Sequence, residues 1–165
     1  RERRPNGKIG GVTPAQLEEL LAFDPLWRMV VECDGSKGRS LKAHASFEPV
    51  VADLDSLVIT VVGLDILGSP LDEEHVHRAP LLAQRLGLAL GTELDLPAVA
   101  RAIARYLERV PPRATSAVLL TKLEPNNEAS AHALARKLRQ LPGARPPQRI
   151  VAASPNEAFE LIADR

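Results

Sequence analysis

Leu57-Val58-Ile59-Thr60-Val61-Val62-Gly63-Leu64 is the most strongly apolar and β-branched stretch of the chain. A run that is apolar at successive positions, rather than at alternate ones, is typical of a parallel strand with both faces covered by helices. We therefore expect a central buried strand here. Shorter apolar runs at 29–33, 116–121 and 149–153 predict three further buried strands.

Helical patterns separate these strands. Thr13 is a candidate cap for a helix that begins at Pro14, since proline suits the first helical position. Further helices are expected over residues 72–86, with Pro80 as a break or kink, and over 96–110, 126–141 and 155–162. Apolar strands that alternate with helices imply parallel strands joined by right-handed crossovers. The sequence thus predicts an α/β fold, a three-layer sandwich around a mostly parallel sheet.

Composition narrows the class of protein. The chain has 165 residues, which favours a single domain over 1–165. Its 21 basic and 21 acidic residues give a net charge of zero, which argues against a nucleic-acid-binding protein. Cys33 is the one cysteine, so no internal disulfide framework is possible, and a reducing, cytoplasmic location is expected. No apolar run approaches the length of about 20 residues that a membrane helix needs, so no membrane partner is expected.

Charged residues follow the apolar run at 29–31. Glu32 and Asp34 are two positions apart, so on a strand they point to the same side. They could share one Mg²⁺, or one could bind metal while the other orients water. Lys37, Arg39 and Lys42 follow directly and favour an anionic ligand such as phosphate. The alternative is that a strand simply ends in a solvated Asp-Gly turn.

A second candidate site is Thr121-Lys122-Leu123-Glu124, at the end of the expected strand at 116–121. Many GTPases have Asn/Thr-Lys-x-Asp at this corner, where the acid binds the guanine edge and the lysine stem covers the ring. Here the acid is Glu124, which is one methylene longer than Asp. The corner could equally be only a turn.

The segment Glu73-Glu74-His75-Val76-His77-Arg78 carries two histidines. Their spacing does not fit the i, i+4 pair of zinc hydrolases, so a metal site is disfavoured. One interpretation is that this segment forms the capped start of a helix. Contact between a substrate anion and the side chains of His77 and Arg78 is the other.

Several segments together resemble a known family. They are Glu32–Lys42, with Asp-Gly-Ser-Lys-Gly-Arg, then Phe47–Val51, Val61–Leu71 with Val-Gly-Leu-Asp-x-Leu-Gly, and His75–Arg78. On these residues the chain resembles the YqeC-type selenium-dependent hydroxylase accessory proteins, which belong among the P-loop NTPases. The resemblance spans roughly residues 7–154.

This resemblance implies a P-loop NTPase-like fold and an Mg²⁺-dependent nucleotide-binding protein, with ATP or GTP as the nucleotide. Asp34 would bind Mg²⁺, directly or through water. Glu32 is the second candidate catalytic acid, on the strength of its spacing from Asp34. Lys37, Arg39 and Lys42 would line the site for phosphate or a second substrate. Lys122 and Glu124 would lie at the corner that holds the nucleotide base. The partner would be a molybdenum hydroxylase client or another maturation factor.

The main difference between this chain and the family is that the chain lacks the family's phosphate-loop motif. Gly-x-x-x-x-Gly-Lys-Ser/Thr does not occur, and in Asn6–Gly11, the nearest stretch, Ile9 stands where the Mg²⁺-binding hydroxyl belongs. We therefore expect this chain to be the carboxyl-terminal portion of a longer P-loop NTPase-like domain, with weak nucleotide binding on its own.

Two other functions are also consistent with the sequence. An Asp-Gly-Ser loop after a carboxylate strand also suits an ATP-dependent ligase or phosphotransferase that acts on a small anionic substrate. A non-catalytic binding module is the third possibility.

Overall fold

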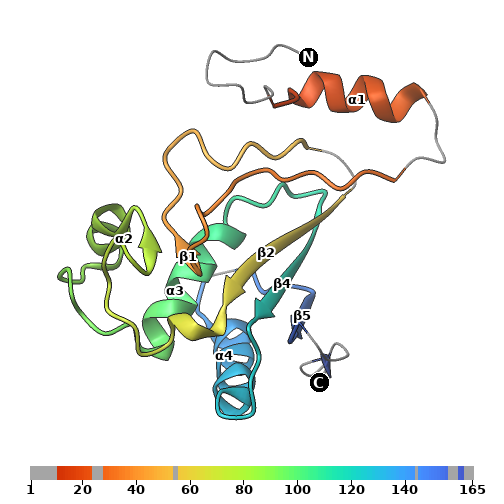
Figure 1. Ribbon diagram of the computed structural model, residues 1–165. Helices are drawn as coiled ribbons and strands as arrows, with labels where there is room; N and C mark the ends of the chain where they lie inside the picture. The colour runs from red at the N-terminus through yellow and green to blue at the C-terminus, as the bar shows by residue number, and fades with distance from the viewer. Residues whose placement is uncertain (1–10, 24–27, 54–55, 144, 156–159, 162–165) are drawn as a thin grey trace.

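The computed structural model describes residues 11–23, 28–53, 56–143 and 145–155, and the backbone of 160–161. Figure 1 shows the elements, which in chain order are α1 (Pro14–Phe23), β1 (Leu41–Lys42), β2 (Leu57–Gly63), a 3₁₀ helix (Leu64–Ile66), β3 (Val76–His77), α2 (Ala79–Leu86), α3 (Leu96–Leu107), β4 (Thr115–Thr121), α4 (Glu128–Gln140), β5 (Arg149–Ala152) and β6 (Glu160–Leu161). No helix of this described part is both long and apolar enough to span a lipid bilayer.

The main sheet has the strand order β2-β4-β5-β6. β2 runs parallel to β4 in a register that pairs Leu57 with Thr115 and Gly63 with Thr121, and β4 runs parallel to β5. β6 is antiparallel to β5. The short strands β1 and β3 form a separate parallel pair. The predicted α/β class and mostly parallel sheet are therefore confirmed.

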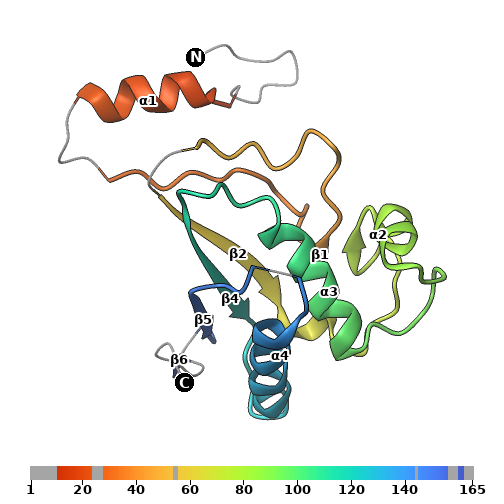
Figure 2. The same cartoon turned by 180° about the vertical axis from the view of Figure 1, so that it is seen from behind.

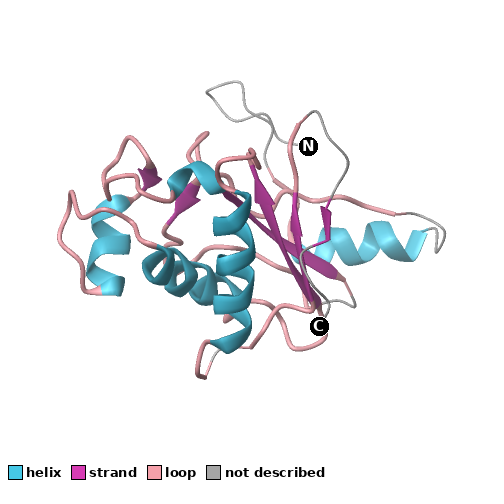
Figure 3. Ribbon diagram, turned by 90° about the horizontal axis from the view of Figure 1, so that it is seen from below, coloured by secondary structure: helices cyan, strands magenta, loops and turns pink. Residues whose placement is uncertain are grey.

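One face of the main sheet holds the core. Val62, Val118, Leu120 and Ile150 are at most 1% exposed and belong to one apolar cluster with residues of α3 and α4. Figure 2 shows these two helices packed together against the strands, and Figure 3 shows the larger helices gathered on one side of the sheet. Burial of this face accounts for the buried aliphatic residues that the sequence predicts.

The opposite face of the sheet is exposed along β2 in the described residues. Leu57, Ile59 and Val61 of β2 are 56%, 51% and 56% exposed. α1, the helix that precedes the sheet in sequence, buries none of its own residues and stands apart from it (Figures 1 and 2). The predictions of three layers and of a central, doubly covered β2 are thus wrong for this part of the chain, because β2 lies at the sheet edge and no described helix packs on its outer face.

The apolar run at 29–33 is not a strand. The segment has no regular secondary structure, Val30 is fully exposed and Val31 is 41% exposed. A buried strand needs a neighbour for its backbone hydrogen bonds and a layer over its side chains. The described residues provide neither to this segment, so Glu32 and Asp34 do not have the strand geometry that the sequence predicts.

Several helix predictions are confirmed. Thr13 Oγ1 accepts a hydrogen bond from the Gln16 backbone N–H, so it caps α1 as expected. α3 begins at Leu96 as predicted, and it is capped by Asp95, a cap that was not predicted, which accepts from the Ala98 N–H at 2.8 Å. α4 covers most of the predicted range 126–141.

Two helix predictions differ from the structure. Helix α2 begins at Ala79, with Pro80 in its first turn rather than at a kink, because Asp72 holds a turn by accepting the backbone N–H groups of Glu74 and His75. For the predicted helix at 155–162, residues 156–159 and 162 lie outside the described part, and residues 160–161 form β6 instead.

Candidate functional site

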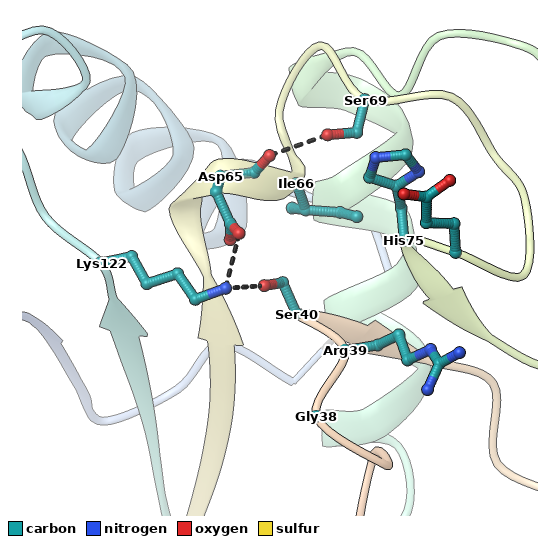
Figure 4. A pocket seen from close by; sticks show the side chains of 9 residues that line it. Gly38, Arg39, Ser40, Asp65, Ile66, Ser69, His75 and Lys122 are labelled. Atoms are coloured by element: carbon teal, nitrogen blue, oxygen red, sulfur yellow. Dashed lines mark hydrogen bonds and ion pairs between the residues drawn. The ribbon is translucent and has the colours of Figure 1, made fainter.

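A small pocket lies at the carboxyl ends of β2 and β4. Ser40 comes from the loop before β1, Asp65 follows β2, and Lys122 follows β4 (Figure 4). The cavity has a volume of about 90 Å³. Parallel α/β sheets bind ligands at this edge because loops from successive strands converge there. The pocket is therefore the first place to look for a function.

Close packing at the end of β2 brings these side chains together. The Gly63 N–H donates to the Ser40 carbonyl at 3.1 Å. A Cβ atom on Gly63 would lie 2.5 Å from Asp65 Oδ1, 2.5 Å from Ser40 Oγ and 2.8 Å from Ser40 Cβ. Only glycine leaves room for this approach, so the Val-Gly-Leu-Asp segment is shaped to place Asp65 against Ser40.

Lys122 joins the two strands through its side chain. Its Nζ donates to Asp65 Oδ2 at 2.5 Å and to Ser40 Oγ at 2.7 Å (Figure 4). Burial opposes ionisation of Asp65, but the hydrogen bonds from Lys122 and Ser40 outweigh it and lower the pKa of this carboxyl. Asp65 is therefore a charged carboxylate at neutral pH, paired with an ammonium group at the pocket.

The backbone holds Lys122 in this position. Its φ of 59° is in the left-handed region, which a non-glycine residue seldom adopts. Asn127 supports the turn, since its Nδ2 donates to the Lys122 carbonyl at 3.0 Å and its Oδ1 accepts from the Glu124 N–H at 2.9 Å. The predicted corner at the end of β4 is thus a tight turn that directs Lys122 across to the end of β2.

His75 and Arg39 form the other side of the pocket. His75 Nδ1 lies 2.7 Å from Asp72 Oδ1. Arg39 Nε donates to the Glu73 carbonyl at 3.2 Å, and its Nη1 donates to the Lys37 carbonyl at 2.9 Å. These bonds attach the loop before β1 to the turn before β3 and set a guanidinium group beside the pocket.

A second group of charges lies away from the pocket lining. In this group, which we call the Lys42 ion cluster, Lys42 pairs with Asp34 and with Glu48, and its side chain is 7% exposed. His44 Nε2 lies 3.1 Å from Asp34 Oδ2. Arg78 binds both oxygens of Glu48 and lowers the pKa of this carboxyl to about 2. The cluster ties residues 34–48 to the start of α2.

Tyr106 of α3 completes this attachment. Its hydroxyl accepts from the Lys42 backbone N–H at 3.0 Å and donates to the Lys42 carbonyl. The ring is buried, and its centroid lies 4.6 Å from that of His44. Burial raises the pKa of Tyr106, so the hydroxyl stays protonated and serves both backbone groups of one β1 residue.

The structure separates the residues that the sequence groups together. Arg39 and Lys122 line the pocket, whereas Asp34 and Lys42 belong to the ion cluster and Glu32 is exposed. A shared Mg²⁺ site on Glu32 and Asp34 was argued from strand geometry, and the segment is not a strand. The metal role of Asp34 stays a prediction.

The other predicted residues lie near the pocket without lining it in the described structure. Lys37 is exposed on the loop, with a φ of 54°. Thr121 Oγ1 donates to the Val62 carbonyl at 3.4 Å, and Glu124 is exposed. His77 is half-buried, and burial together with the charges of Lys37, Lys42 and Arg78 lowers its pKa. Base binding by Thr121 and Glu124, and anion binding by Lys37, His77 and Arg78, stay predictions.

Most residues of the pocket, among them Asp65, Ser40 and His75, were not predicted as site residues. Asp65 directly follows the strongest strand, so the reasoning applied to Asp34 would have found it. Ser40 and His75 carry weaker signals, because a loop serine and a histidine beside acidic residues are common. Their placement depends on contacts between segments far apart in the chain.

The fold and this pocket define an α/β protein with a charged site at the carboxyl edge of a parallel sheet. Residues 1–80 match the family model described as "YqeC protein". The chain is also 34% identical over 90 residues to "Uncharacterized protein YqeC" of Escherichia coli (strain K12), a match that covers 54% of this chain and 35% of that protein. The amino-terminal half of the chain is therefore similar to YqeC proteins.

The chain spans about a third of the length of this relative. No solved structure matches the chain. Ser40, Asp65, Asp72 and His75 all fall within the matched residues 1–80, whereas Lys122 lies beyond them. The matched segment therefore contributes most of the pocket.

Proposed function

We propose that this protein binds a magnesium nucleotide at the pocket between β2, β4 and the loop before β1. The convergence of Lys122, Asp65 and Ser40 at the carboxyl edge of two adjacent parallel strands carries the proposal. An ammonium group suits a phosphate oxygen, and a carboxylate beside a hydroxyl supplies the hard oxygen ligands that Mg²⁺ prefers.

The pocket volume indicates which part of a nucleotide enters it. About 90 Å³ is well below the 300–1,000 Å³ of pockets that enclose a whole small molecule. A phosphate group fits this space, so the sugar and base would lie outside it. Arg39, in the loop before β1, would contact a second phosphate.

Asp65 suits the magnesium ion better than Asp34 does. Both carboxylates are paired with a lysine, but the Asp34 side chain is only 12% exposed, whereas that of Asp65 is 50% exposed. The described residues contain no group of three or more His, Cys, Asp or Glu side chains that could hold a metal by themselves. Phosphate oxygens and water would complete the coordination, as is usual for Mg²⁺.

The biological role that we propose is that of an accessory protein in the maturation of selenium-dependent molybdenum hydroxylases. This part rests on the resemblance of the Asp-Gly-Ser-Lys-Gly-Arg and Val-Gly-Leu-Asp segments to the YqeC-type family. Nucleotide binding would then order the loop at 37–42 and change the affinity for a client protein.

Calorimetry on the complete polypeptide tests the proposal, with ATP and GTP each titrated in the presence and absence of Mg²⁺. Lys122→Met removes the ammonium group, and we expect it to weaken binding by at least about 10-fold, the effect of one charged hydrogen bond. Lys137→Met on the exposed side of α4 is the matched control and should bind as wild type.

The relative affinities for ATP and GTP also distinguish two interpretations of the Thr121–Glu124 corner. A preference for GTP would support it as a guanine site, and a preference for ATP would favour kinase or ligase chemistry. The proposal is wrong if neither nucleotide binds, or if Lys122→Met binds as tightly as wild type.

A further inference from the structure

His75 is the one pocket residue whose ring is oriented by a separate carboxylate. Its Nδ1 lies 2.7 Å from Asp72 Oδ1, and the same oxygen accepts the backbone N–H groups of Glu74 and His75 at 3.0 Å. Asp72 is thereby fixed in a tight turn immediately before β3. The carboxylate cannot rotate away without losing three hydrogen bonds, so it is a rigid support for the imidazole.

This contact determines which ring nitrogen carries the hydrogen. The hydrogen bond with His75 lowers the pKa of Asp72, so its carboxylate is ionised and can only accept. Nδ1 of His75 must therefore donate, and in the neutral ring Nε2 holds the free lone pair. The side chain is 35% exposed and lines the pocket, so the ring can be reached from it.

The surroundings of His75 are suited to a reaction at phosphate. Figure 4 shows the ring on the side of the pocket opposite Lys122, with Ser40 between them and Arg39 below. The charged groups around it are Asp72, Glu73 and Glu74 on its own turn, Arg39 on the neighbouring loop, and the Asp65–Lys122 pair across the pocket. Two cations, Arg39 and Lys122, and two carboxylates, Asp65 and Glu74, thus border the space where a phosphate would lie, and the His75 ring lines it.

We infer that His75 is a general base that activates water for attack on the terminal phosphate of the bound nucleotide, with Asp72 as its positioning residue. The inference rests on the proposed function. The water oxygen forms a bond to phosphorus, the bond to the bridging oxygen breaks, and Nε2 of His75 takes the water proton. The products are a nucleoside diphosphate and inorganic phosphate, and the proton passes to solvent. No redox partner is required.

A purely structural role for the Asp72–His75 pair is the alternative, because the same contacts would also stabilise the turn before β3. The two roles make different demands on the ring. A structural pair needs only the Nδ1 hydrogen bond, whereas a base also needs an Nε2 lone pair that is free and faces substrate. Glutamine at position 75 preserves a hydrogen-bond donor but supplies no base.

The test compares His75→Gln and Asp72→Asn with His132→Gln. His132 is the control because it is also a partly exposed histidine near an acid, with Nε2 4.0 Å from Glu128 Oε1, but it lies on α4 outside the pocket lining. Binding of Mg-ATP and Mg-GTP is measured by calorimetry and turnover by phosphate release. Nitrogen-15 NMR of the histidine rings reports the tautomer of His75 without any nucleotide.

We expect His75→Gln to bind nucleotide within about threefold of wild type and to lose at least about 100-fold in kcat, the usual contribution of a general base. Asp72→Asn should lower kcat by a smaller factor and shift the ring away from the Nδ1–H tautomer. His132→Gln should match wild type in both measurements.

Three results would overturn the inference. One is turnover by His75→Gln at the wild-type rate, and another is a wild-type His75 ring in the Nε2–H tautomer. The third is wild-type binding without hydrolysis, which would leave the proposed function standing. Absence of nucleotide binding in the wild type is a different result, because it rejects the proposed function together with the reaction that rests on it.

Discussion

Replacement of Lys42 by methionine tests whether this lysine is a structural ion or a phosphate ligand. The sequence assigns Lys42 to phosphate. In the structure its ammonium group instead contacts Asp34, Glu48 and the Gly35 carbonyl, and the side chain is 7% exposed. Methionine has a similar length and an apolar stem, so Lys42→Met removes the charge with little change in volume.

The loss of unfolding free energy depends on which carboxylates remain without a partner after the substitution. Removal of one partner from a buried ion pair costs about 3–5 kcal/mol, because the other charge stays buried without compensation. Glu48 keeps Arg78, but among the described residues Asp34 keeps only the contact with His44, in which its Oδ2 has no hydrogen bond. Burial chiefly lowers the pKa of His44. His44 is then neutral at pH 7. We therefore expect a loss near the lower end, about 3 kcal/mol of unfolding free energy.

Urea unfolding at pH 7 measures this loss. Lys137→Met on exposed α4 is the control and should change the unfolding free energy by no more than about 0.5 kcal/mol. The double substitution Lys42→Met with Asp34→Asn removes the stranded charge, so it should be more stable than Lys42→Met alone. A loss below about 1 kcal/mol for Lys42→Met would refute the reasoning and leave Lys42 available for phosphate.

Two further substitutions test the same region. Tyr106→Phe leaves the buried N–H and carbonyl of Lys42 without their hydroxyl partner, so we expect a loss of about 1–3 kcal/mol by urea unfolding; an unchanged midpoint would contradict that role. Because Arg78 holds the pKa of Glu48 at about 2, against 4.5 for the free group, the stability that this carboxylate contributes is complete above pH 4.5 and is lost as the pH falls towards 2. Unfolding free energy measured at pH 5 and at pH 2.5 should differ less in Glu48→Gln than in wild type, and equal differences would show that Glu48 does not contribute.

The candidate site was predictable only in part. Arg39 and Lys122 were found from their positions after expected strands, and both line the pocket. Asp34 and Lys42 were assigned together to metal and phosphate, but they neutralise one another. A sequence shows that opposite charges are close along the chain, and it does not show whether they face a ligand or each other.

The elements that the sequence alone determined are those whose signals are local. The β-branched run at 57–64, the cap at Thr13, and the apolar spacing of α3 and α4 each act within a few residues, so β2, β4, β5 and the main helices follow from them. The Gly63-Leu64-Asp65 segment likewise places a carboxylate at the end of a strand.

Tertiary structure alone decided which surfaces are covered and which charges meet. The run at 29–33 has the composition of a strand, but it lacks a neighbouring strand and a covering layer in the described residues, so it stays exposed. Lys122 reaches Ser40, 82 positions earlier, only because β2 and β4 are adjacent and end at the same edge. Burial and pairing depend on contacts between distant segments, and for that reason the pocket emerged from the fold rather than from any one motif.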